Sequence, residues 1–233
     1  MSLLTNPYWL YPAATGGATP RIVQSTVSAD TGGNLSLPLT LSNVTAGNAL
    51  IVTLSGYNGN PNVLDTAKDG STSLTMYQAF TPGGNYSMAA IGYEFNVAAG
   101  SHTVTVSNAS TLTSSYYTAA LHEVSGLSNA SPNVSVNGTT TGATLTLAGS
   151  TPSVNNCFII TVIADDGEGS TSTATITTPS GYTSLWQELN GANYQLGAAA
   201  YQIQTTAAPV APSWTGLNAA GGAGFAAVAL AFN

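Results

Sequence analysis

Apolar and β-branched residues along this chain are grouped in short runs that are separated by glycine, asparagine and proline. The clearest run covers residues 49–54 and lies between turn residues at 48 and 56–59. Such a run is typical of a strand buried near the middle of a sheet. A second run of the same kind, at 157–162, follows 108 residues later, counted from Asn48 to Asn156.

Most other segments alternate between apolar and polar residues, and turn signals such as Gly-Gly and Asn-Gly separate them. Leu35, Leu37, Leu39 and Leu41 alternate with polar residues, and Pro38 makes this strand an edge strand or a bulged one. No segment has a convincing 3.6-residue period. The predicted strands are 22–28, 35–41, 50–57, 73–80, 86–95, 102–107, 116–124, 134–137, 144–147, 158–164, 182–189, 194–204, 211–215 and 225–232.

The strand pattern indicates an all-β fold with a possible internal duplication. At the fixed offset of 108, Tyr93 matches Tyr201 and the turns stay in step without a gap, which gives pseudo-repeats at about 35–125 and 144–233. Strands that pair across the halves would form one antiparallel double-sheet β-sandwich of the jelly-roll kind over residues 21–233. Two separate small sandwiches are the alternative, but the short join at 126–135 favours a single domain.

Residues 1–20 have neither a helical nor a strand period, yet they contain aromatic and leucine side chains between prolines. Disordered tails are usually poor in aromatics, so we expect an extended arm that docks on a neighbouring subunit. Alternatively, the arm covers an end of its own sandwich. The arm lacks the basic start of a secretory signal and the apolar run of a transmembrane span. The expected docking residues are Leu4, Tyr8, Trp9, Leu10 and Tyr11.

The balance of charge excludes two classes of partner. Arg21 and Lys68 are the two basic residues, against nine acidic ones, and the net charge is −7. Binding to a nucleic-acid backbone or to an anionic membrane needs several basic residues that act together, so we expect neither partner. With 5% charged residues, solubility depends on neutral polar side chains, which suit packing against another protein.

One acidic cluster is a candidate metal site. Asp165, Asp166 and Glu168 follow a predicted buried strand, and calcium prefers several oxygen ligands that converge from a loop. The spacing does not match an EF-hand, and a solvated loop is the alternative interpretation. No other cofactor is predicted.

The sequence contains no recognisable catalytic motif. His122 and Glu123 lie next to each other on a predicted strand, so their side chains point to opposite faces and cannot form one acid–base pair. We expect His122 to be partly buried and bonded to a backbone group, and His102 to lie on the surface. Cys157 is expected to be a buried apolar residue, and one cysteine forms no internal disulfide. The chain is therefore predicted not to be an enzyme.

Several aromatic residues outside the arm permit a different function. If they shared one sheet face, they could form a platform on which a sugar stacks; in a sandwich, such residues more often lie in the core or cap an end. The residues concerned are Tyr57, Tyr77, Tyr182, Trp186 and Trp214.

Three stretches, at 44–52, 93–106 and 119–126, resemble jelly-roll-like β-sandwich domains of phage virion proteins and bacterial surface proteins. The resemblance rests on strand and turn patterns and implies a virion-surface or extracellular module. It leads us to expect a phage capsid decoration (cement) or other surface protein, homo-oligomeric, that docks on structural subunits such as a capsid protein. The alternatives are an extracellular filament subunit or adhesin that donates its arm as a strand, and a carbohydrate-binding module that recognises a glycan.

Overall fold

The computed structural model describes residues 19–30, 36–57, 65–81, 87–108, 116–128, 131–165, 176–190, 195–217 and 224–233. Over these ranges the regular structure consists of β-strands alone, and every sheet is antiparallel. The predicted all-β, antiparallel sandwich is therefore confirmed. Within the same ranges, no helix is long and apolar enough to cross a membrane.

The strands form two central sheets and two outer ones. The first central sheet has the order β1 (Arg21–Asp30), β9 (Tyr116–Ser125), β3 (Ala49–Tyr57), β7 (Ser87–Glu94), β6 (Thr75–Phe80). The second has the order β10 (Val134–Thr140), β16 (Phe225–Phe232), β12 (Cys157–Asp165), β14 (Gln195–Gln204), β13 (Thr183–Asn190). An outer sheet contains β2 (Ser36–Val44), β8 (Gly100–Asn108), β4 (Asp65–Asp69) and β5 (Thr72–Ser73), and an outer pair contains β11 (Thr144–Thr146) and β15 (Ser213–Thr215).

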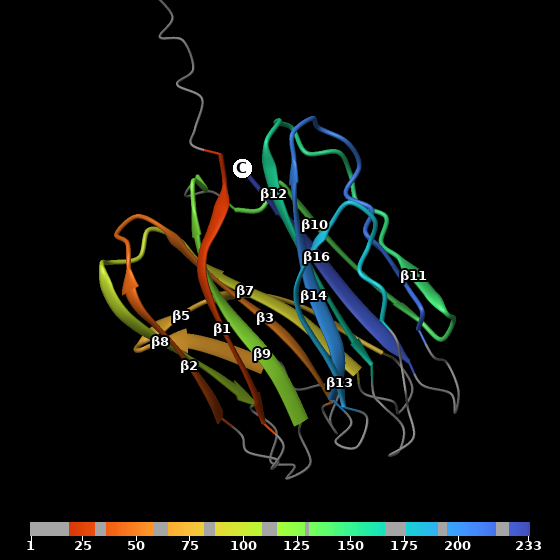
Figure 1. Cartoon of the computed structure of the whole chain (residues 1–233), viewed down its shortest axis with the longest axis horizontal. Helices are drawn as coiled ribbons and strands as arrows, with labels where there is room; N and C mark the ends of the chain where they lie inside the picture. Colours follow the sequence, from red (N-terminus) through yellow and green to blue (C-terminus); the bar gives the residue numbers. More distant parts are fainter. Residues whose placement is uncertain are drawn as a thin grey trace, which may run out of the picture.

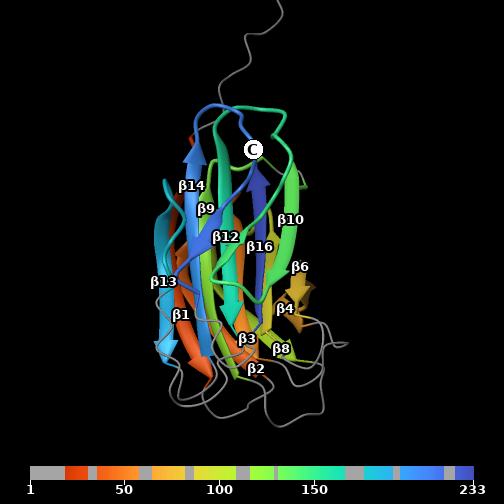
Figure 2. The ribbon, with the colours of Figure 1, turned by 90° about the vertical axis from the view of Figure 1, so that its right-hand side faces the viewer.

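The sheets are stacked in layers, with the two central sheets face to face (Figures 1 and 2). Along β3, Leu50 and Val52 pack toward the outer sheet, whereas Ile51 packs toward the second central sheet. Along β12, Phe158 and Ile160 face the first central sheet, and alternate residues face the outer pair. Both strands are thus covered on both faces, which explains why their sequences are continuous apolar runs and do not alternate.

Each sheet is built from one half of the chain. The first central sheet and the outer sheet come from residues 21–125, and the second central sheet and the outer pair come from residues 134–232. The expectation that strands pair across the halves is therefore wrong for the described strands. The halves meet face to face through one shared apolar layer, because β3 and β12 each carry a second apolar face that needs cover.

The gap-free offset of 108 also needs correction. Tyr93 and Tyr201 both contribute to the layer between the central sheets, so the offset preserves the face of β7 and β14. Ile51 pairs with Tyr93, however, and Ile160 pairs with Tyr201, so Ile160 occupies the place of Ile51. The offset points instead to Ile159, which faces the outer pair. A slip of one residue turns every side chain of a strand to the other face.

The distance between the central sheets changes along the strands. At one end, Gly197 on β14 lies so close to β3 that a Cβ atom there would be 2.0 Å from Ser55 Oγ. At the other end, the rings of Tyr93, Phe95 and Phe232 fill the space, with centroids 5.2 to 5.8 Å apart. The sheets diverge toward this aromatic end, where the C-terminus also lies (Figure 1). Side-chain size therefore sets the angle between the halves.

Pro38 lies on β2, which is an edge strand of the outer sheet, as predicted. The predicted strand 73–80 is divided into β5 and β6 at Leu74, whose backbone N–H donates to Ala67 O. The predicted strand 211–215 is shorter in the structure, where β15 covers Ser213–Thr215.

Candidate functional site

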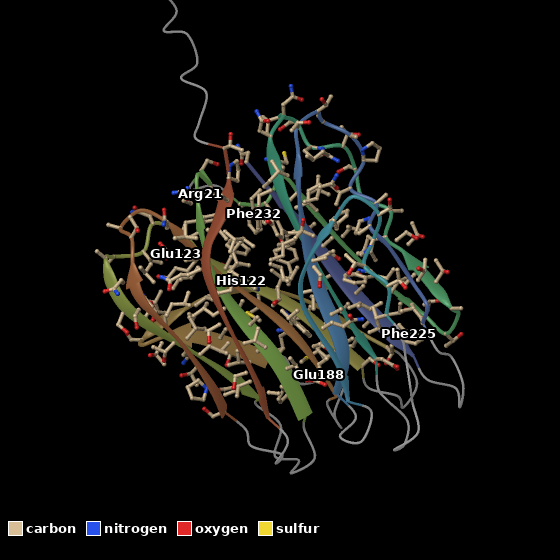
Figure 3. The ribbon with its side chains drawn as sticks, viewed as in Figure 1. Arg21, His122, Glu123, Glu188, Phe225 and Phe232 are labelled. Carbon is tan, nitrogen blue, oxygen red and sulfur yellow. The ribbon has the colours of Figure 1, made fainter. Side chains whose placement is uncertain are left out.

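His122 lies at the centre of a chain of hydrogen bonds between the two central sheets (Figure 3). Its Nε2 is 3.2 Å from Thr53 Oγ1, and its Nδ1 is 2.8 Å from Ser25 Oγ. Thr53 Oγ1 also accepts a hydrogen bond of 2.8 Å from Trp186 Nε1, which belongs to the other half of the chain. Side chains, and not the backbone group that the sequence suggested, therefore satisfy His122.

This arrangement holds a neutral imidazole. His122 is fully buried, and burial lowers its pKa to about 4. Ser25 is exposed, and its hydroxyl lies beside a ring nitrogen of His122. A serine beside a histidine is one part of a nucleophilic catalytic site. The other ring nitrogen of His122, Nε2, contacts the Thr53 hydroxyl. In a catalytic triad a carboxylate occupies this place. The chain of bonds joins β1, β9, β3 and β13, and its evident role is to fix the two halves against each other.

Glu123 points to the opposite face, as predicted, and forms a second buried polar centre. Its carboxylate accepts hydrogen bonds from Gln24 Nε2 at 2.6 Å, Thr45 N at 2.9 Å and Asn48 Nδ2 at 2.5 Å. Burial alone would raise the pKa of Glu123, but these hydrogen bonds outweigh it and lower the pKa. The carboxylate thereby ties β1 and the turn between β2 and β3 to β9. Sequence analysis missed this role, because the donors converge only in the folded chain.

His102 does not lie free on the surface, as the sequence suggested, but is half-buried in an ion pair with Asp69. Its Nε2 is 3.0 Å from Ala98 O, which can only accept, and its Nδ1 contacts the Asp69 carboxylate. Both ring nitrogens therefore donate, which defines an imidazolium. Burial alone would lower the pKa of His102, but the bonds to Asp69 and Ala98 raise it above its ordinary value.

Glu94 is the third ionisable group of this cluster. Burial and the nearby charge of Asp69 raise the pKa of Glu94, while His102 acts in the opposite direction. Among the described residues, no group of three or more histidine, cysteine or acidic side chains is arranged to hold a metal ion. The cluster is a local network of charge that joins Asp69 and His102 of the outer sheet to Glu94 at the end of β7.

Of the three predicted calcium ligands, the structure describes Asp165 alone. Asp165 ends β12 and is buried. Asp166 and Glu168 lie outside the described residues. The arm residues Leu4, Tyr8, Trp9, Leu10 and Tyr11 also lie outside them. The calcium site and the docking arm both remain predictions.

Among the described side chains, the aromatic residues do not form one exposed platform; the side chain of Tyr57 lies outside the described part of the structure. Trp186 is buried between the central sheets, and Trp214 is buried beneath the outer pair, where its Nε1 donates to Thr161 Oγ1 at 3.2 Å. Tyr182 packs beside the core that contains Trp214, and burial raises its pKa to about 12. Tyr77 packs in the layer that contains Trp186. The two tryptophans therefore act in the core and are not placed to stack a sugar.

The most accessible apolar feature is β1, at the edge of the first central sheet (Figure 1). Within the described strands β1 is paired with β9 alone, and none of residues 21–29 is buried. Val23 and Val27 have exposed fractions of 43% and 50%, the two highest among the large apolar side chains of the described chain. Since residues 1–20 lead directly into β1, the arm and this edge together are the candidate interface.

Comparison with known proteins gives no assignment: a scan of protein-family models and a search of curated proteins both find no match.

Proposed function

We propose that this protein is a non-enzymatic structural protein that binds neighbouring subunits through its arm and the adjoining edge of β1. The observation that carries this proposal is the uncovered strand β1, with its exposed Val23 and Val27, directly after an arm rich in aromatic residues. Aromatic anchors and added strands are two common ways in which one protein holds another.

The ionisable groups of the interior support a structural role. His122 is neutral and bonded on both ring nitrogens, and the Glu123 carboxylate accepts several hydrogen bonds. Both groups stabilise contacts between strands through these hydrogen bonds. This is the arrangement expected when buried polar groups fix a unique packing of sheets.

The outward faces support contact with protein. Thr40 Oγ1 lies 2.9 Å from Thr103 Oγ1 on the outer sheet, and Thr146 Oγ1 lies 2.6 Å from Ser213 Oγ on the outer pair. Paired hydroxyls of this kind give a neutral polar surface. These hydroxyl pairs add no charge of their own to the repulsion between copies, each of which has a net charge of −7.

The resemblance to phage virion domains supports a proposal for where this role is carried out. We propose a capsid decoration or other virion-surface protein, homo-oligomeric, with a capsid protein as the docking partner. A filament subunit or adhesin is a second candidate, because an open edge strand such as β1 can accept a donated strand.

We also propose that the halves arose by duplication of a jelly-roll-like unit. The strand order β1, β9, β3, β7, β6 in one central sheet has the same pattern as β10, β16, β12, β14, β13 in the other. The outer contacts match too, since β2 pairs with β8 and β11 pairs with β15. Two greek-key sandwiches stacked through their larger sheets would produce this arrangement.

Deletion of residues 1–20 tests the docking role. We expect the shortened chain to keep its thermal midpoint, because the described core begins after the arm, but to lose co-sedimentation with heads assembled without this protein. A full-length variant with Tyr8, Trp9 and Tyr11 replaced by alanine is the matched control and should lose binding as well. Attachment that is unchanged in both variants would contradict the proposal.

A further inference from the structure

We propose that the free edge of β1 pairs with β1 of a second copy, antiparallel about a two-fold axis, so that the two first central sheets become one continuous sheet. This inference rests on the proposed function and deepens it, because it names a second copy as the occupant of the β1 edge. The pairing itself does not depend on the arm. Three features of β1 favour this pairing: its exposure, its run of uncharged residues without proline, and the charges at its ends.

Apart from the register shift between Ile22 and Gln24, the edge of β1 has few of the features that usually prevent sheets from joining. Between Arg21 and Asp30 the strand has no charged residue and no proline. The neighbouring edge strand of the outer sheet carries Pro38, and β13, one of the two edge strands of the second central sheet, carries Glu188. Among the described strands only β9 pairs with β1, so the ten residues of β1 form an edge that carries two exposed valines.

The register of β1 against β9 shows how two copies would fit. Arg21 pairs with Ser125 and Asp30 pairs with Tyr117. Ser125 and Tyr117 are separated by an even number of residues, so the backbone positions 21 and 30 have the same place in the alternation of the sheet. A register shift between Ile22 and Gln24 makes this possible, because it changes the face of the residues before it.

Antiparallel pairing then becomes self-complementary. If Arg21 of one copy lies opposite Asp30 of the other, both ends of the ladder bring opposite charges together. The axis passes through Thr26, whose partner Leu121 lies midway between Tyr117 and Ser125 on β9. Opposite charges and paired threonines across strands each stabilise a sheet. A strand with opposite charges at its two ends matches a reversed copy of itself, which is the requirement for a two-fold interface.

The arm is a poorer occupant of the same edge. Its prolines at 7, 12 and 20 leave stretches of four and seven residues for a ladder, and the longer stretch contains Gly16 and Gly17, which weaken a strand. Proline itself cannot donate a hydrogen bond to a neighbouring strand. A second β1 offers the whole strand and matched end charges, so we assign the edge to a second copy.

Cysteine cross-linking of the full chain tests the register. Thr26→Cys places two thiols opposite each other at the axis, so mild oxidation should give a covalent dimer. Ser28→Cys, on the same face of the same strand, is the matched control. It should remain uncross-linked, because residue 28 of the second copy lies several residues away along the paired strand. The proposal would be overturned if Ser28→Cys forms a cross-linked dimer and Thr26→Cys does not, or if neither variant forms one.

The mass in solution and its dependence on charge test the contacts. Light scattering at about 100 µM chain should give the mass of two chains and not the 23.4 kDa of one. Arg21→Glu and Asp30→Arg should each weaken the dimer on the order of tenfold, and the two together should restore it. A monomer, or a dimer that ignores both charge reversals, would refute the pairing. The chain without residues 1–20 should remain dimeric, which separates this result from the test of the arm.

Discussion

At the scale of single residues, His122 and Glu123 are neighbours in the chain but belong to different buried networks. His122 lies between the two halves, and Glu123 lies on the opposite face with the turn between β2 and β3. Their opposite directions follow from strand geometry, which the sequence already implied. The hydrogen-bond partners of the two residues could not be predicted from the sequence, because Trp186 is brought to Thr53 only by the packing of β13 over β3.

The neutral state of His122 predicts a loss of stability in mild acid. Its pKa is about 4 in the folded chain and about 6.5 when unfolded. Between these values the unfolded chain binds the proton and the folded chain does not. Lowering the pH from about 6.5 to 4 should therefore reduce the free energy of unfolding by about 3 kcal/mol. Urea denaturation at several pH values measures this effect.

His122→Gln is the control variant, because glutamine can bond to Ser25 and Thr53 without titrating; its stability should change less over this pH range. His102 should act in the opposite direction. Its pKa is raised in the folded chain, so its contribution is fully present below about pH 6.5 and is lost as the pH rises through the folded pKa. An unchanged pH profile in His122→Gln would show that other groups cause the acid effect.

At the scale of elements, the strands were largely predictable and their partners were not. The runs at 49–54 and 157–162 identified β3 and β12, and Pro38 identified an edge. The sequence could not show which face of β12 meets the other half, because Phe158 and Ile159 are both apolar and both buried. A face can be read from a strand only when one of its two faces is polar.

Gly197, where β14 lies close to β3, is the described glycine at which an added side chain would meet its neighbours at the shortest distance. A methyl group there would meet Ser55 Oγ at 2.0 Å and Ile163 O at 2.8 Å. Gly197→Ala should therefore lower the free energy of unfolding by at least about 2 kcal/mol. Adding Ser55→Gly should recover part of the loss. Gly142→Ala is the control, since its nearest neighbour lies at 3.4 Å. Thermal denaturation compares the variants, and equal midpoints for Gly197→Ala and Gly142→Ala would contradict the close approach.

At the scale of the whole molecule, each half contributes one sheet face to a shared layer. Ile51, Ile91 and Val124 from the first half are covered by residues of the second, such as Val162 and Leu230. The sequence indicated two related halves but led to the wrong expectation that their strands pair. Charge-poor, apolar strands are compatible with pairing edge to edge or packing face to face, and pattern alone does not distinguish the two.

This shared layer predicts that the halves depend on each other. Residues 19–128 expressed alone should expose Ile51, Ile91 and Val124 to water and give an aggregating or loosely packed product. Co-expression with residues 131–233 should yield a soluble complex of the two fragments. Gel filtration and near-ultraviolet circular dichroism measure this outcome. A soluble, well-packed first half on its own would show that the two halves are independent domains.

The change from small residues at Gly197 to aromatic rings at Phe232 has a geometric consequence for any assembly. The two outer layers of the molecule are not parallel, because the central sheets diverge between them (Figure 1). Copies that meet through these outer layers must therefore turn by a fixed amount from one to the next. A shell built in this way would take its curvature from the volume of a few side chains at one end of a single interface.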